Sequence, residues 1–148
     1  MTSAKTMEAL IRLAARKVDD AAQALALRIT REREALAKLK LLTDYREDYF
    51  VRFGAQAAAG LAEAQLANYR AFLARLETAI AEQQRLVEDA RAGVAAAQAQ
   101  WQAEQQRLKS YEVLDERRLT RQRALGARRE QREQDEYAAH LHRRTRTA

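Results

Sequence analysis

Apolar residues recur every seven positions through the second half of the chain. With Leu66 taken as position a of a heptad, a large apolar residue occupies every a position of seven consecutive heptads. A strict seven-residue repeat predicts a helix that supercoils in a left-handed sense against a partner helix. The a series comprises Leu66, Leu73, Ile80, Val87, Val94, Trp101 and Leu108, and the d series comprises Tyr69, Leu76, Gln83, Ala90, Ala97, Glu104 and Tyr111.

The first part of the chain carries a second apolar stripe, which is less regular. Gaps of three and four separate its members, as expected for one face of a helix. Glu32 interrupts the stripe, and Ser3 or Thr2 is expected to cap the start of the helix. The stripe consists of Ile11, Ala14, Val18, Ala22, Leu25, Ile29, Leu36 and Leu39. We therefore predict a first helix over about residues 3–53.

The segment GAQAAAG at 54–60 is where two glycines lie close together. Glycine is costly inside a helix and common just after a helix ends, so this segment predicts a bend. A second helix is then expected over about residues 61–140. The prediction is an all-α antiparallel coiled-coil hairpin, a single domain over residues 1–148. Pairing about the middle of the bend places Leu42 across from Phe72 and Tyr45 across from Tyr69.

Composition agrees with long helices, because proline is absent and Ala, Gln, Glu, Arg and Leu dominate. The absence of cysteine excludes disulfides and thiolate metal sites. The sequence has neither an apolar run long enough to span a bilayer nor a secretory signal at its start. We therefore expect a soluble cytosolic protein.

The net charge of +6 is concentrated near the C-terminus. Residues 117–146 contain ten arginines and four acidic residues, which accounts for the whole imbalance. The second helix is predicted to be longer than the first, so residues 117–148 form a basic overhang. Such a segment attracts an anionic surface, which could be acidic protein, nucleic acid or membrane. Because stacking aromatics and a nucleic-acid motif are missing, an acidic protein surface is the preferred interpretation.

Half of the Tyr and Phe residues lie in one segment, residues 39–53. Tyr45 and Tyr49 share a helix face with Leu42, and one two-helix seam is too narrow to bury every face of this segment. A partner-binding patch is therefore predicted at Tyr45 and Tyr49, since aromatics are enriched at interface hot spots. Phe50 and Phe53 are instead expected to form local core near the bend.

Four residues of the second helix form a stripe that faces this aromatic segment. Its members are spaced four, three and four, and they are Phe72, Leu76, Ala79 and Gln83. Leu76 is expected to be ordinary core, whereas Phe72 lies beside the seam rather than in it. The two stripes together predict one continuous apolar face.

Catalysis finds little support in the sequence. His140 and His142 are the only histidines and are too few for a metal site without acidic ligands. A glycine-rich phosphate loop and a nucleophile elbow are both missing, and a thin helical rod offers no deep pocket in which to shift a pKa. We therefore expect neither enzymatic activity nor a cofactor. The remaining alternatives are a basic nucleic-acid-binding coiled coil and a self-associating structural rod.

Several strings of the sequence together resemble the FliJ family of flagellar export proteins. They are LKLLTDYREDY, NYRAFLARLETAI, the lone Trp101, and the closing LDERRLTRQ and REQDEYA. The spacing of Leu42, Tyr45 and Tyr49, followed by the pair Asn68-Tyr69, is the most specific part. The resemblance extends from about Leu10 to Tyr137, and the injectisome counterpart of the family is the nearest alternative.

The resemblance implies a role in bacterial flagellum biogenesis, protein export by the type III apparatus, and hence motility and chemotaxis. Proteins of this family are two-helix coiled coils similar to the central stalk of rotary ATPases. The implied partners are the hexameric export ATPase, the membrane export gate and export chaperones, which the family escorts. The implied location is the cytoplasm, peripheral at the cytoplasmic side of the cell membrane, and a monomer is expected.

The resemblance also assigns residues to partners. At position 83 the family carries a histidine, which this chain replaces with Gln83. The contact with the ATPase is not assigned by the resemblance, and the basic overhang supplies its candidates. The implied gate-binding surface comprises Leu42, Tyr45, Tyr49, Phe72, Leu76, Ala79 and Gln83, and the candidates for ATPase binding are Arg117, Arg118, Arg121, Arg128 and Arg129.

Overall fold

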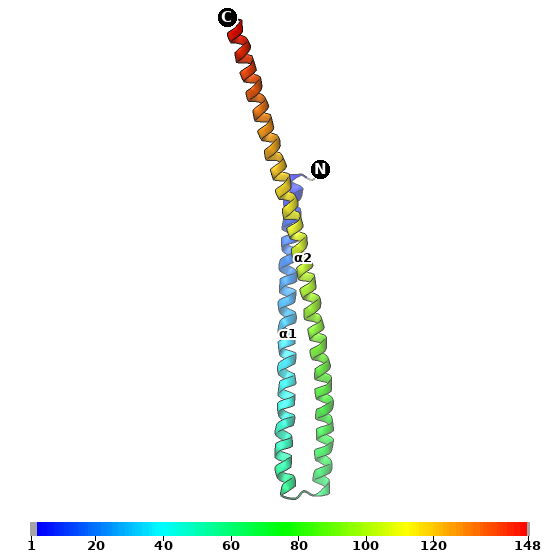
Figure 1. The fold of residues 1–148 in the computed structure, drawn as a ribbon. Helices are drawn as coiled ribbons and strands as arrows, with labels where there is room; N and C mark the ends of the chain where they lie inside the picture. The colour runs from blue at the N-terminus through cyan, green and yellow to red at the C-terminus, as the bar shows by residue number, and fades with distance from the viewer. Residues whose placement is uncertain (1–2, 148) are drawn as a thin grey trace. The chain divides into compact units, whose positions relative to one another are not determined.

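The computed structural model describes residues 3–147, and within them the chain forms two helices and no strand. Helix α1 spans Ala4–Ala58 and helix α2 spans Glu63–Arg146. Figure 1 shows both helices and the short connection between them. The predicted all-α fold of two long helices that pack against each other is confirmed. Among the described residues, neither helix contains a stretch apolar enough to cross a bilayer.

Local capping explains where the helices begin. The Ser3 hydroxyl oxygen accepts a hydrogen bond from the backbone N–H of Thr6 at 3.2 Å, so Ser3 is the N-cap of α1. The other predicted cap, Thr2, lies outside the described residues. At the start of α2, the side-chain oxygen of Gln65 accepts a hydrogen bond from the Ala62 N–H at 3.3 Å. This reciprocal arrangement is half of a capping box and fixes the first turn of α2.

The bend is shorter than predicted and lies later in the chain. Helix α1 continues through Gly54 and ends at Ala58, so only residues 59–62 connect the helices. Gly60 has a φ of 94°, the left-handed conformation that glycine adopts without strain after a helix end. The residues after Gly54 are strong helix formers, which offsets the cost of about 1 kcal/mol for one helical glycine. Helix α2 also extends beyond the predicted residue 140 to Arg146.

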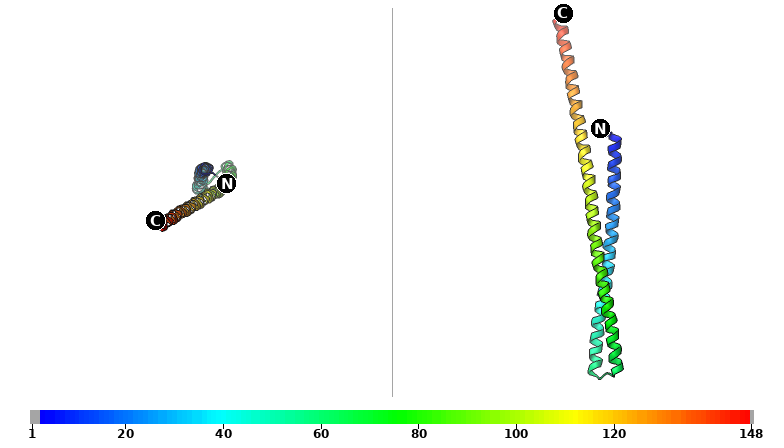
Figure 2. Two further views of the ribbon diagram at one scale, coloured as in Figure 1. Left: turned by 90° about the horizontal axis from the view of Figure 1, so that it is seen from above. Right: turned by 90° about the vertical axis from the view of Figure 1, so that its right-hand side faces the viewer.

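By its internal contacts the chain divides into two units, and unit 2 comprises residues 17–104. In this unit the cyan part of α1 and the green part of α2 run antiparallel, side by side, and cross each other in the right-hand view of Figure 2. Every a and d residue from Leu66 to Glu104 is buried or half-buried, as the heptad pattern predicted. The most deeply buried apolar side chains are Ile80 and Val87, at 2% and 3% exposure. The seam between the helices is therefore the core of the unit.

The register of the hairpin differs from the predicted one because the bend lies later. Tyr49, rather than Tyr45, is stacked on Tyr69, with ring centroids 5.1 Å apart. Phe72 contacts Tyr45 and Tyr49 in place of the predicted Leu42. Moving the centre of a hairpin along the chain shifts every cross-helix partner, so the pairing error follows directly from the error in the bend.

Unit 1 comprises residues 1–16 and 105–148, of which 3–16 and 105–147 are described. Met7 and Ala14 of α1 are buried there, and Leu108 and Tyr111 of α2 are half-buried. The heptad continues to Asp115 and Arg118, which are half-buried and joined by an ion pair of 3.0 Å. From Leu119 to Thr147 every residue is exposed, so this segment of the predicted basic overhang is solvated helix.

Candidate docking surface at the end of the hairpin

Five aromatic rings form a continuous ladder near the connection between the helices of unit 2. Phe53 and Tyr49 of α1 both stack on Tyr69 of α2, with centroid separations of 3.2 Å and 5.1 Å. Tyr49 also contacts Phe72 at 4.6 Å, and Phe72 meets Tyr45 edge-on at 6.0 Å. Each aromatic pair contributes about 1 kcal/mol beyond its buried area. The ladder therefore holds this end of the hairpin in one arrangement.

The ladder is buried at one end and open at the other. Tyr69 is only 8% exposed, whereas Tyr45 is 50% exposed although it is a large aromatic residue. Tyr49 and Phe72 are half-buried between them. The two helices thus present Tyr45 on a rigid aromatic base, and we call this side of the hairpin the Tyr45 edge.

The residues predicted for gate binding divide into two groups in the structure. Tyr45, Tyr49 and Phe72 come together at the Tyr45 edge, and Leu42 and Ala79 are half-buried beside the seam. Leu76 and Gln83, in contrast, are buried in the seam at 7% and 4% exposure. We therefore interpret the first group as the candidate contact surface and the buried pair as residues that support it.

Gln83 forms a polar contact across the seam. Its side-chain amide nitrogen donates a hydrogen bond to the backbone carbonyl oxygen of Ala35 at 2.9 Å. A buried polar residue in a coiled coil fixes the register at a cost in stability. The d-position stripe of the sequence correctly placed Gln83 in the seam, and its bond to the partner helix explains how an amide is accommodated there.

Replacing Gln83 with leucine is expected to raise the free energy of unfolding by about 1 kcal/mol, because an apolar side chain then fills an apolar seam. Chemical denaturation followed by circular dichroism measures this change. Ala79→Leu, at a half-buried position beside the seam, is a control for added apolar volume alone. A decrease in stability for Gln83→Leu would contradict the interpretation, since it would mean that the hydrogen bond to Ala35 outweighs apolar packing.

A shallow groove accompanies the Tyr45 edge at the connection between the helices. An ion pair of 3.1 Å between Asp48 and Arg52 lies along α1 beside it, and amide side chains of both helices supply hydrogen-bonding groups. Aromatic faces next to unoccupied amides suit the side chains and backbone of another polypeptide. The groove is lined by Tyr45, Asp48, Tyr49, Arg52, Phe53, Gln56, Leu61, Gln65, Asn68 and Tyr69.

Sequence reasoning missed the amide residues of this groove and misplaced one aromatic. Gln56, Gln65 and Asn68 carry no apolar signal, although the pair Asn68-Tyr69 marked the region. Phe50 was expected in local core but is 47% exposed, whereas Phe53 packs on Tyr69 as expected. Phe50 follows Tyr49 by one residue, which is about 100° around a helix, and so it lies on the side of the seam opposite to Tyr45.

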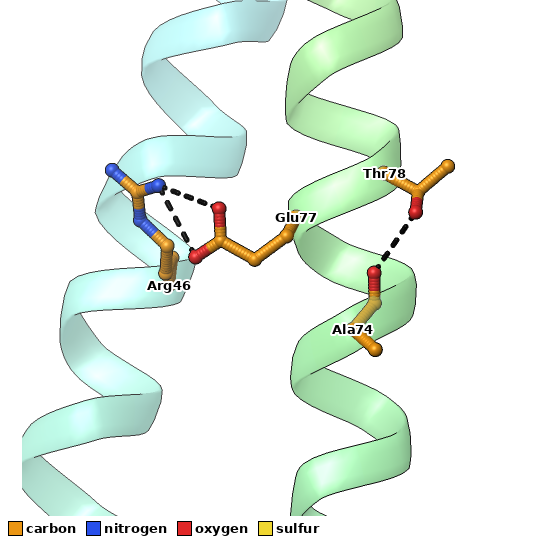
Figure 3. A network of polar contacts seen from close by, with 4 residues as sticks. All are labelled: Arg46, Ala74, Glu77 and Thr78. Carbon is orange, nitrogen blue, oxygen red and sulfur yellow. Dashed lines mark hydrogen bonds and ion pairs between the residues drawn. The ribbon is translucent and has the colours of Figure 1, made fainter.

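An ion pair closes the side of the hairpin opposite the Tyr45 edge. Arg46 of α1 donates hydrogen bonds from one guanidinium nitrogen to both carboxylate oxygens of Glu77 of α2, at 3.1 Å and 3.3 Å (Figure 3). The same view shows the Thr78 hydroxyl, which donates to the Ala74 carbonyl oxygen of its own helix. Because Arg46 and Glu77 are partly exposed, this bridge contributes at most about 1 kcal/mol.

The candidate arginines for ATPase binding lie in unit 1 and differ in their surroundings. Arg118 is half-buried, and its guanidinium donates two hydrogen bonds to one carboxylate oxygen of Asp115, at 3.0 Å and 3.2 Å. Arg117, Arg121, Arg128 and Arg129 are all exposed. We therefore expect the exposed four to be available to a partner and Arg118 to stabilise the helix where the seam ends.

Comparison with known proteins identifies relatives along almost the whole chain. The model of one protein family, described as "Flagellar FliJ protein", matches residues 3–147. The chain is 30% identical over 126 residues to the "Flagellar FliJ protein" of Escherichia coli (strain K12), which covers 85% of this chain and 86% of that protein. It is 30% identical over 132 residues to the protein of the same name from Salmonella typhi, which covers 89% and 90% of the two chains.

Proposed function

The chain belongs to the FliJ family of flagellar proteins, and from this premise we propose that it is a non-catalytic stalk of the flagellar protein-export apparatus. In this role it binds the hexameric export ATPase through the basic segment of unit 1. It engages the membrane export gate through the Tyr45 edge of unit 2, and it escorts export chaperones. The stalk acts as a monomer at the cytoplasmic side of the cell membrane.

The observation that carries the proposal is the exposed end of the aromatic ladder. A half-exposed tyrosine normally costs little to bury, but Tyr45 lies on a base of four further rings that hold it in place. A rigid aromatic group loses little conformational entropy when a partner covers it, and this favours tight binding. An export gate that supplies a complementary apolar surface would therefore gain affinity from this edge.

The solvated arginine-rich helix supports the second contact. From Leu119 to Thr147 every residue is exposed, and the excess of arginine over acidic residues in 117–146 gives the segment its positive charge. Positive charge along a free helix accelerates association with an acidic surface and keeps two copies of the same segment apart. An ATPase ring with acidic residues in its central opening is the partner that suits this charge.

Purified full-length chain, added to the purified hexameric export ATPase, is expected to raise the rate of ATP hydrolysis severalfold, because a bound stalk biases the ring subunits. The release of inorganic phosphate measures this rate. Double-stranded DNA, tested for binding at the same ionic strengths, serves as the competing anionic partner. Unchanged hydrolysis together with tight, salt-dependent DNA binding would replace the proposal with a nucleic-acid function.

A further inference from the structure

The polar residues in the seam of unit 2 do not pair with each other. Gln83 is level with Ala35, to which it donates its hydrogen bond. Glu32 precedes Ala35 by three residues, and in an antiparallel pair a step back along α1 corresponds to a step forward along α2. Glu32 is therefore level with Val87, which is 3% exposed and apolar. Glu32 is itself half-buried, so a carboxylate lies beside an apolar layer of the core.

A slide of the two helices by about one turn would correct this mismatch. Seam residues alternate at gaps of three and four in both helices, so such a slide keeps every one of them in the seam. Glu32 then becomes level with Gln83, whose amide donates to the carboxylate instead of to Ala35. In the same movement Leu39, now level with Ile80, becomes level with Leu76. The displacement is about 5 Å at the helical rise of 1.5 Å per residue.

The connection between the helices has room to lengthen in one direction. Gly54 and every residue of α1 after it are exposed, and a Cβ atom built at Gly54 meets nothing within 4 Å. Unwinding this last turn therefore exposes no core and removes a helical glycine, the weakest helix former after proline. The first turn of α2 is held more firmly, since Gln65 caps Ala62 and Leu66 is half-buried. The slack thus lies in α1.

We infer that the hairpin of unit 2 has two registers about one helical turn apart, and that residues after Gly54 unwind to permit the second. Shifts of this size between packed elements are a known form of two-state switch. In the second register Tyr45 becomes level with Tyr69, and Tyr49 moves toward Leu66. The slide therefore rebuilds the Tyr45 edge, so a partner bound there favours one register over the other.

Cysteine pairs introduced into the cysteine-free chain report each register. Leu42→Cys with Leu76→Cys joins residues that are level in the observed register. Leu39→Cys with Leu76→Cys joins residues that are level only after the slide. Leu42→Cys with Ile80→Cys has the same offset in the opposite direction, which would require the capped first turn of α2 to unwind. The rate of intramolecular disulfide formation in a fixed glutathione buffer is measured for each full-length variant.

The pair at 39 and 76 is expected to close within about tenfold of the rate for the pair at 42 and 76, and the pair at 42 and 80 at least about tenfold more slowly than the pair at 39 and 76. Equal rates for the two offset pairs would overturn the inference, because simple separation of the helices treats both offsets alike.

A glycine substitution separates the slide from any loss of stability that the cysteines cause. Gly54→Ala strengthens the last turn of α1, so it is expected to slow closure of the pair at 39 and 76 about fivefold while closure of the pair at 42 and 76 stays unchanged. Gly126→Ala is the matched control, since Gly126 is another helical glycine with open space around it. If Gly54→Ala leaves closure of the pair at 39 and 76 unchanged, the inference fails.

Discussion

Replacing Tyr45 with alanine is expected to reduce flagellar export at least tenfold while the hairpin stays folded. Tyr45 is the exposed end of the aromatic ladder and contacts Phe72 only edge-on, at 6.0 Å. Its loss therefore costs about 1 kcal/mol of stability. Loss of an aromatic hot spot, in contrast, weakens a protein interface by about 2 kcal/mol or more, a factor of about thirty. Quantifying flagellin in the culture medium measures the export defect.

Phe50→Ala is the matched control for this substitution. Phe50 lies on the same helix with a similar exposure, 47% against 50% for Tyr45, but on the opposite side of the seam. It is expected to leave export unchanged, and both variants should retain wild-type helicity by circular dichroism. Equal export defects in the two variants would show that general loss of apolar surface, rather than the Tyr45 edge, explains the effect.

Tyr49→Ala has a different expected outcome because Tyr49 lies within the ladder. Its ring stacks on Tyr69 and contacts Phe72, so alanine at this position removes two ring contacts as well as contact surface. A loss of export in that variant would therefore mix folding with binding. For this reason Tyr45, rather than the Tyr45 and Tyr49 pair, gives the sharper test of the docking surface.

The heptad pattern predicted the seam correctly, residue by residue, because burial in a two-helix protein is decided by local periodicity. All a and d residues from Leu66 to Tyr111 are buried or half-buried, including the polar Gln83 and Glu104. Periodicity fixes which face of a helix is buried but not which residue lies across from it. That second property depends on the connection, where a few residues decide between alternatives of similar energy.

The error in the register shows how small that decision is. Gly54 and Gly60 both suit a helix end, and the sequence gives no reason to prefer one of them. In the structure Gly60 terminates the helix through its positive φ, while Gly54 remains helical. The exposure of Tyr45 and the burial of Gln83 both follow from that choice, so the candidate surface was predicted in its membership but not in its arrangement.

Replacing Arg121 and Arg128 with glutamine is expected to weaken binding to the export ATPase about tenfold, since each exposed ion pair contributes up to about 1 kcal/mol. The two arginines are exposed and seven residues apart, so they lie on one face of α2. Glutamine retains helix propensity and removes only the charge. Titrating the chain against the ATPase and measuring hydrolysis at each concentration gives the apparent affinity.

A second double variant, Arg123→Gln with Arg144→Gln, removes the same charge from a different face of the helix. Arg123 follows Arg121 by two residues, about 200° around the helix, and Arg144 lies three heptads beyond Arg123. If one face of the helix binds the ring, this variant should keep wild-type affinity. Equal weakening of both variants would instead mean that overall positive charge steers the encounter, and salt would then abolish the difference from the wild-type chain in both cases.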